Sequence, residues 1–247
     1  MEAPEQSNSF GFLNGNALKI IALAAMTADH IGTFIFPELI FLKITGRLAM
    51  PIFAYMIAEG CMYTKSKRKY VLLVGLVGII CQMAVYVTLQ SLAQYILITF
   101  TLSIILIYLL QFIWEKLRKG RFLWLSAMIA AVAAVYVISD ILPGVIPCWF
   151  QIEYGFWGVM LPVLIYVPEL FAEGTFKRIL KLLFAAVGLV MVALRGNPVT
   201  YQWFSLAALI LLLFYNGRRG RLRLKYLFYV YYPVHMAICY WIGTLVR

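Results

Sequence analysis

The sequence predicts an all-α protein, a polytopic bundle of transmembrane helices. Of its 247 residues, 64% are hydrophobic and only 13% are charged, a composition far from that of a soluble domain. Apolar runs of about 20 residues, the length that crosses a bilayer, recur along the whole chain. We therefore expect a single integral membrane domain over residues 1–247. The composition excludes a disordered protein and a disulfide-stapled secreted fold.

About nine apolar segments predict nine spans. The first follows an acidic N-terminal stretch and is longer than a signal-peptide core, so we expect it to stay as a helix. The prolines of the stretch 143–154 are typical of a loop or a re-entrant turn. The expected helices are 17–37, 47–64, 70–89, 94–114, 122–142, 155–172, 178–195, 199–216 and 226–246.

The basic residues predict the orientation of the chain, because Lys and Arg collect in short cytoplasmic loops. Loops after the third and fifth spans have none. The pattern predicts a cytoplasmic N-terminus and an external C-terminus, and it makes the net charge of +11 a feature of topology, not of nucleic-acid binding. Binding of anionic head groups or of a phosphorylated donor is the alternative, most of all for the loop GRRGRLRLK. Most of the basic residues follow the second, fourth, sixth and eighth spans: Lys65, Lys67, Arg68, Lys69, Lys116, Arg118, Lys119, Arg121, Lys177, Arg178, Lys181, Arg218, Arg219, Arg221, Arg223 and Lys225.

Ionisable residues inside the predicted spans are candidates for function, because they are costly in a membrane. The first helix contains Asp29 and His30, and the last contains His235; the chain has two histidines. At the helical rise, His30 and His235 lie roughly 18 and 14 Å from the cytoplasmic ends of their helices. A neutral histidine can take and return a proton. The alternative is that each histidine is a hydrogen-bonded packing residue.

Three further residues are candidate binding residues. Lys19 precedes His30 by eleven positions, which returns it to nearly the same helix face; the alternative is a snorkelling anchor. Arg47 interrupts the alternation of basic loops, because it lies with Lys43 on the predicted outer side. Glu59 lies roughly 8 Å from the inner end of the second span, and pairing with the next basic loop is its alternative role.

The cysteines predict neither a metal site nor a disulfide framework. They are widely spaced, without a CxxC motif or nearby histidines, and we interpret them as packing residues. The sequence contains no dinucleotide-binding, P-loop or serine-hydrolase motif. The four are Cys61, Cys81, Cys148 and Cys239.

Several segments together resemble the TraX family of conjugal transfer proteins. They are LKIIALAAMTADHIG, GRLAMPIFAYMIAEGCMYT with KRKY after it, ILITFTLSI, EYGFWGVMLPVLIY and KYLFYVYYPVHMAI, and they cover most of the chain. The resemblance implies an integral protein of the inner, cytoplasmic membrane that is associated with N-terminal acetylation of a conjugative pilin.

The family is also similar to polytopic membrane acyltransferases, whose first helix has an arginine, ten residues and then a histidine. Here Lys19 and His30 occupy these positions. The resemblance implies acetyl-CoA as the donor, His30 as the general base, and Asp29 or His235 orienting it. It implies donor- or substrate-binding roles for Lys19, Arg47 and Glu59. The expected partners are membrane lipids, an acyl-CoA and an acceptor that is a pilin, another peptide, a lipid or a glycan.

Two other functions remain open at this point. A proton-coupled transporter or flippase could use Asp29, His30 and Glu59 as relay groups. Such proteins are often built from internal repeats, and no repeat is evident in the sequence. A non-enzymatic assembly subunit could dock a pilin, in which case the paired histidines would have no chemical role.

Overall fold

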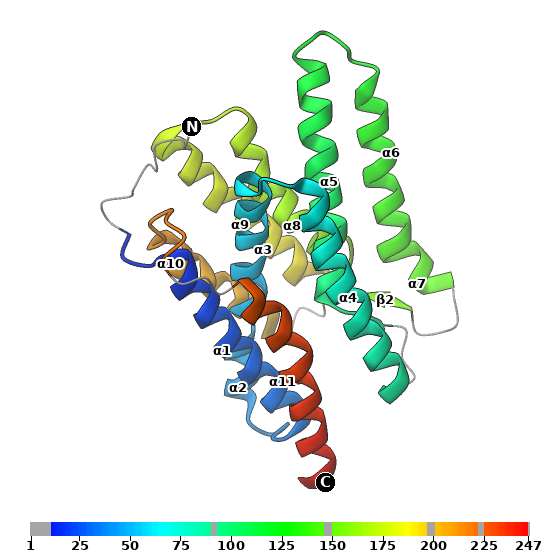
Figure 1. The fold of residues 1–247 in the computed structure, drawn as a ribbon, viewed down its shortest axis with the longest axis vertical. Helices are drawn as coiled ribbons and strands as arrows, with labels where there is room; N and C mark the ends of the chain where they lie inside the picture. The colour runs from blue at the N-terminus through cyan, green and yellow to red at the C-terminus, as the bar shows by residue number, and fades with distance from the viewer. Residues whose placement is uncertain (1–10, 90–92, 146–149, 197–200, 222–224, 247) are drawn as a thin grey trace. The chain divides into compact units, whose positions relative to one another are not determined.

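The structure is a computed structural model that describes residues 11–89, 93–145, 150–196, 201–221 and 225–246 (Figure 1). Within these ranges nine helical segments lie at about the positions of the nine predicted spans. Five are long and apolar enough to cross a membrane: Gly15–Phe34, Ile40–Tyr63, Lys67–Val87, Ile96–Leu117 and Trp124–Val145. The prediction of a helical membrane protein is confirmed.

The helical elements follow one another with short connections. They are α1 (Gly15–Phe34), α2 (Ile40–Gly46), α3 (Ala49–Tyr63), α4 (Lys67–Leu89), α5 (Ile96–Leu117), α6 (Trp124–Tyr136), a π-helix (Val137–Ile141), α7 (Leu142–Val145), α8 (Gly155–Tyr166), a 3₁₀ turn (Val167–Leu170), α9 (Gly174–Arg195), a 3₁₀ helix (Tyr201–Ala207), α10 (Ala208–Leu213) and α11 (Lys225–Val246).

The structure adds detail at two places. The predicted connection between the first two spans contains a helix, α2. The stretch 143–154 includes β2 (Gln151–Ile152), which pairs in parallel with β1 (Ala93–Gln94). Each strand has only two residues, so this pairing closes a loop and leaves the fold all-helical.

The chain divides into two compact units, Met1–Met56 with Leu189–Arg247 and Ile57–Gly188. The prediction of one membrane domain over residues 1–247 stays a prediction.

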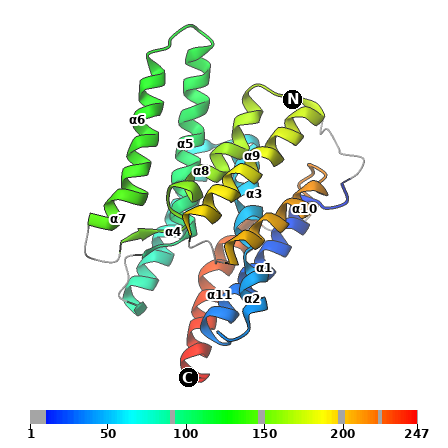
Figure 2. The ribbon, with the colours of Figure 1, turned by 180° about the vertical axis from the view of Figure 1, so that it is seen from behind.

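The first unit is built on α1. This helix begins at an Asn14 cap, whose side-chain oxygen accepts the backbone N–H of Ala17 at 2.9 Å, the usual chemistry of a helix start. It packs along α2 and α11, and the three helices lie side by side in both views (Figure 1; Figure 2). Glycines allow this approach: a Cβ at Gly32 would lie 2.9 Å from the Cβ of Leu42.

The second unit is organised around α5, which packs against α4, α6 and α8. Buried hydroxyls support these contacts, since Ser103 donates to the carbonyl of Val159 at 2.7 Å. The Asp140 carboxylate accepts the backbone N–H of Phe156 at 2.8 Å and thereby caps the first turn of α8.

The described cysteines are free and buried, as expected of packing residues: Cys61, Cys81 and Cys239. Cys148 lies outside the described residues.

Candidate functional site

The structure brings the chain's two histidines together in the first unit. His30, in the second half of α1, and His235, on α11, form a hydrogen bond of 2.7 Å between Nδ1 of His30 and Nε2 of His235. The ring centroids are 4.8 Å apart. His235 is 5% exposed. Two positions more than 200 residues apart in sequence therefore form one part-buried imidazole pair.

The surroundings of His235 fix which ring nitrogens hold protons. Nδ1 of His235 is 2.8 Å from the carbonyl oxygen of Tyr231. A carbonyl only accepts hydrogen bonds, so this nitrogen carries the hydrogen. In the neutral ring Nε2 of His235 is then an acceptor, and Nδ1 of His30 must donate to it. It follows that Nε2 of neutral His30 keeps its lone pair and is the basic atom of the pair.

A second polar contact holds α11 against α1 about one helical turn away. The Tyr231 and Thr27 hydroxyl oxygens are 2.7 Å apart, and Thr27 Oγ1 donates to the carbonyl of Leu23 at 2.8 Å. Since a hydroxyl has one hydrogen, Tyr231 donates to Thr27. The Tyr231 ring also stacks on the His235 ring, with centroids 4.9 Å apart and 12° between the planes. Tyr231 therefore positions His235 through both its carbonyl and its ring.

Asp29 forms an ion pair with Arg47, which follows α2. Both side chains are about one-fifth exposed, 22% for Asp29 and 23% for Arg47. Arg47 also donates from Nε to the carbonyl of Lys43 at 3.2 Å and from Nη1 to Gln202 Oε1 at 3.4 Å. Adjacent helical residues point about 100° apart, so the Asp29 side chain pairs with Arg47 while the His30 side chain bonds to His235. Arg47, which interrupts the alternation of basic loops, thus has the carboxylate of Asp29 in the first helix as its partner.

Gly46 makes room for this ion pair, and its replacement gives a first prediction. A Cβ at this position would overlap the Asp29 side chain. We expect Gly46→Ala to lower the free energy of unfolding by about 1–3 kcal/mol, the usual cost of overpacking. Thermal unfolding of the purified protein in detergent measures this. Gly144→Ala is the matched control, because no described atom lies within 4 Å of its added Cβ. Equal shifts for the two variants would contradict the close approach at Gly46.

Lys19 is half-buried near the start of α1 and lies within electrostatic range of Arg219. Its eleven-residue separation from His30 corresponds to about 16 Å along the helix. The structure therefore places Lys19 on the helix of the histidine pair but at its other end.

Glu59 lies in the second unit, in a buried network of charges. Its carboxylate pairs with Lys181 of α9, which also contacts Glu169 Oε1 at 2.8 Å. Lys177 pairs with the other oxygen of Glu169 at 3.0 Å. Lys181 is 4% exposed. Glu59 belongs to the second unit and the histidine pair to the first. The partner of Glu59, Lys181, lies on α9, 122 residues away in the sequence.

Sequence reasoning missed Lys181, Gln202 and Tyr231. Lys181 was grouped with a cytoplasmic loop, but α9 begins at Gly174, so Lys181 lies two turns inside a helix. Gln202 was detectable as an amide within an apolar span, and it is 8% exposed. Tyr231 contributes a backbone carbonyl, for which a sequence gives no signal. Among the described residues, no group of three or more His, Cys, Asp or Glu residues could hold a metal ion.

These features define a class: a polytopic helical membrane protein whose apolar interior contains a hydrogen-bonded histidine pair and an arginine–aspartate pair. The chain belongs to the TraX protein family, whose profile matches residues 14–243. The predicted resemblance is confirmed. The matched range includes all six candidate residues, which are Lys19, Asp29, His30, Arg47, Glu59 and His235.

Two curated relatives are similar to the chain. The probable fimbrial assembly protein FimC of Dichelobacter nodosus is 26% identical over 244 residues, which cover 90% of this chain and 92% of that protein. An uncharacterized protein of Rickettsia prowazekii is 30% identical over 155 residues, 62% of this chain. That match spans 54% of the Rickettsia protein, about half of its length. No solved structure matches the chain.

Proposed function

We propose that the protein is a membrane acyltransferase that moves an acetyl group from acetyl-CoA to a nucleophilic acceptor, with His30 as the general base. The observation that carries the proposal is the His30–His235 hydrogen bond, together with the bond from His235 to the Tyr231 carbonyl. This arrangement supports a role in proton transfer, because it fixes one tautomer and leaves Nε2 of His30 basic. Orientation of a base by a second group is the logic of catalytic triads.

The proposed reaction balances with these groups alone. An acceptor amine or hydroxyl attacks the thioester carbonyl, and Nε2 of His30 takes its proton. The bond from the acetyl carbon to the acceptor forms, and the bond from that carbon to sulfur breaks. The proton then passes from His30 to the CoA thiolate. As charge develops on His30, its Nδ1–H bond to His235 strengthens, since a hydrogen bond with an ionised partner is the stronger one.

The remaining candidate residues take supporting roles in the proposal. Asp29 neutralises Arg47 within the membrane and leaves the guanidinium in place beside Gln202, where we assign it to substrate binding. Lys19 binds the donor near the start of α1. We assign Glu59 a structural role, because its carboxylate pairs with the buried Lys181, which also pairs with Glu169.

The predicted topology supports a cytosolic donor, with the chain in the cytoplasmic membrane and its N-terminus inside. We propose a pilin-like peptide N-terminus as the acceptor, since the Dichelobacter relative is named a probable fimbrial assembly protein. Another peptide, a lipid or a glycan is tested as the acceptor in the same assay. If no acetyl transfer occurs, the result favours a proton-coupled transporter or a non-enzymatic assembly subunit.

The experiment that tests this function follows radiolabelled acetyl-CoA with purified protein in lipid nanodiscs. Transfer to peptide, lipid and glycan acceptors and slow transfer to water are measured together. We expect the wild type to turn over, and His235→Leu to lower kcat by about 10–100-fold with little change in KM, because it removes the acceptor for Nδ1 of His30. His235→Gln places an amide oxygen near the position of Nε2 and should recover part of the rate. The proposal would be refuted if the wild type turned over no acceptor, or if His235→Leu kept the kcat of the wild type.

A further inference from the structure

The loop 216–221 is attached to the start of the helix that contains His30. The carbonyl oxygens of Arg218 and Arg219 accept the backbone N–H groups of Gly15 and Asn16 at 2.7 and 3.0 Å. The backbone N–H of Leu13 donates to the carbonyl oxygen of Phe214, just before the loop, at 3.0 Å. The first N–H groups of a helix have no partner within the helix, so this loop supplies what α1 lacks. The loop is thereby fixed in position on α1.

Two glycines give the loop its tight path. Gly217 and Gly220 have φ angles of 75° and 89°, which residues with a Cβ rarely adopt. At Gly220 a Cβ would also lie 2.8 Å from both Asn14 Oδ1 and Asn16 Nδ2. Asn14 is the cap of α1, so the loop and the helix start depend on each other.

The loop carries three arginines close to the start of α1, and one of them, Arg219, is near Lys19. The side chains of Arg218, Arg219 and Arg221 are exposed, and the charge of Arg219 acts on Lys19. Among the described residues of the first unit the acidic ones are Asp29, which is paired with Arg47, and Glu38, which follows the far end of α1. Like charges held close together repel, and an anion bound among them relieves the repulsion. Guanidinium groups bind phosphate oxygens in pairs.

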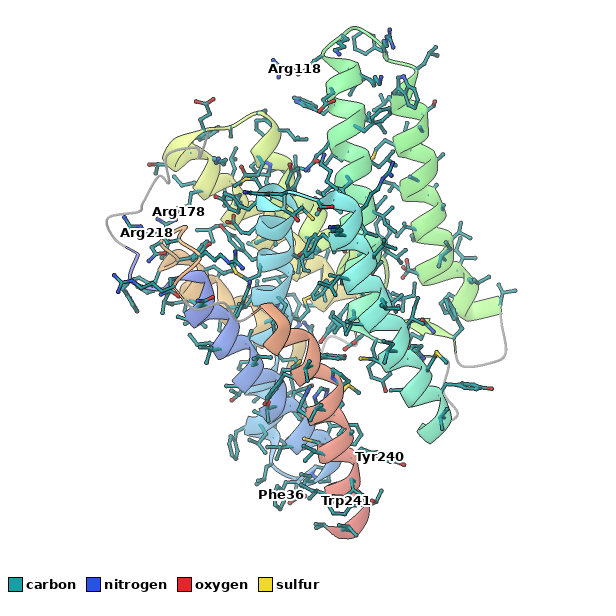
Figure 3. All side chains as sticks on the ribbon, viewed as in Figure 1. Phe36, Arg118, Arg178, Arg218, Tyr240 and Trp241 are labelled. Atoms are coloured by element: carbon teal, nitrogen blue, oxygen red, sulfur yellow. The ribbon has the colours of Figure 1, made fainter. Side chains whose placement is uncertain are left out.

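The two ends of the first unit differ in character. Figure 3 shows Arg218 at the end where α1 begins, and Phe36, Tyr240 and Trp241 at the opposite end. His30 of the histidine pair lies between these ends on α1, fifteen residues, or about 22 Å, beyond Gly15. The basic loop at the start of α1 and His30 are thus separated along the helix. A donor whose phosphates and reactive group are joined by a long arm fits this separation.

We propose that the loop 216–221, with Lys19, binds the phosphate groups of the CoA donor. The proposal rests on the proposed acyltransferase function and deepens it. The pantetheine arm separates the phosphates of CoA from its thioester, so phosphates at the start of α1 leave the thioester free to extend toward His30. Because the loop is bonded to α1 through its backbone, the phosphate site and the base are set on one helix. Anionic lipid head groups have the same phosphate chemistry, and the experiment separates the two sources.

The test measures binding of CoA, and of pantetheine, which has no phosphate, to the full chain in nanodiscs of phosphatidylcholine. The loop variant is Arg218→Gln/Arg219→Gln/Arg221→Gln. The matched control, Arg118→Gln/Lys119→Gln/Arg121→Gln, removes the same charge from another basic loop. We expect the loop variant to weaken CoA binding at least about tenfold and to leave pantetheine binding unchanged, while the control binds both as the wild type does. Gly220→Ala keeps every charge and should weaken CoA binding too, because it displaces the loop.

Three outcomes would overturn the inference. The loop variant and the control could bind CoA equally, Gly220→Ala could bind as the wild type does, or the loop variant could lose only the retention of phosphatidylglycerol in mixed-lipid nanodiscs. The last result would assign the loop to lipid head groups. Loop-dependent CoA binding without acetyl transfer would support this inference and refute the acyltransferase. Transfer that survives with unchanged CoA binding in the loop variant would refute this inference alone.

Discussion

Replacing His30 with alanine is expected to lower acetyl transfer by about two to four orders of magnitude, the usual contribution of general acid–base catalysis. The side chain supplies Nε2, the basic nitrogen of the pair, and the variant has no base at that position. The loss should appear in kcat, with CoA binding retained. Initial rates of label transfer from acetyl-CoA measure it.

The control for this variant is Thr33→Ala on the same helix. Thr33 is near His30 in sequence and uses its hydroxyl only to bond the carbonyl of Asp29 at 2.8 Å, so its loss should leave the rate within about twofold. Added imidazole should restore part of the rate of His30→Ala if the missing group is a base. A folded His30→Ala protein with the rate of the wild type would remove His30 from the chemistry.

Replacing Lys181 with methionine is expected to be the most destabilising single change in the second unit. Lys181 is 4% exposed and faces two carboxylates, those of Glu59 and Glu169. Removing one partner of a buried ion pair leaves an uncompensated charge and costs about 3–5 kcal/mol. Thermal unfolding in detergent measures the loss.

Two comparisons separate the charge effect from loss of packing. Lys177→Met removes a cation whose side chain is 29% exposed, and we expect a cost of at most about 1 kcal/mol. In the triple variant Lys181→Met/Glu59→Gln/Glu169→Gln, the buried charges are removed together, and most of the stability should return. If the triple variant were less stable than Lys181→Met, the ion network would not be the cause.

Much of the fold could be predicted, because length and hydropathy are strong signals in a membrane chain. The helix α2 was missed, since seven residues around Lys43 are too few to show a pattern. The positions of basic residues were a weaker guide to where a loop ends and a helix begins. The rule that basic residues mark loops grouped Lys181 with Lys177, whereas α9 contains both residues four positions apart, and both contact Glu169.

The candidate site could be predicted in part. Depth along two helices placed His30 and His235 at similar levels, but both Asp29 and His235 stayed open as the group that orients His30. The choice of His235 as the orienting group required the three-dimensional structure. The pairing of Arg47 with Asp29 also depends on the path of α2, which returns the chain to the side of α1. The tautomer depends on a backbone carbonyl, which no residue type reveals.

The measurement that tests the account most directly is NMR of the histidine ring nitrogens in isotope-labelled protein. The chain has two histidines, so every signal belongs to the pair. We predict that in the neutral pair both rings carry hydrogen on Nδ1, with a scalar coupling between Nδ1 of His30 and Nε2 of His235, and that His235→Leu abolishes the coupling. Hydrogen on Nε2 of His30, or the absence of coupling in the folded wild type, would contradict the assignment of His30 as an oriented base.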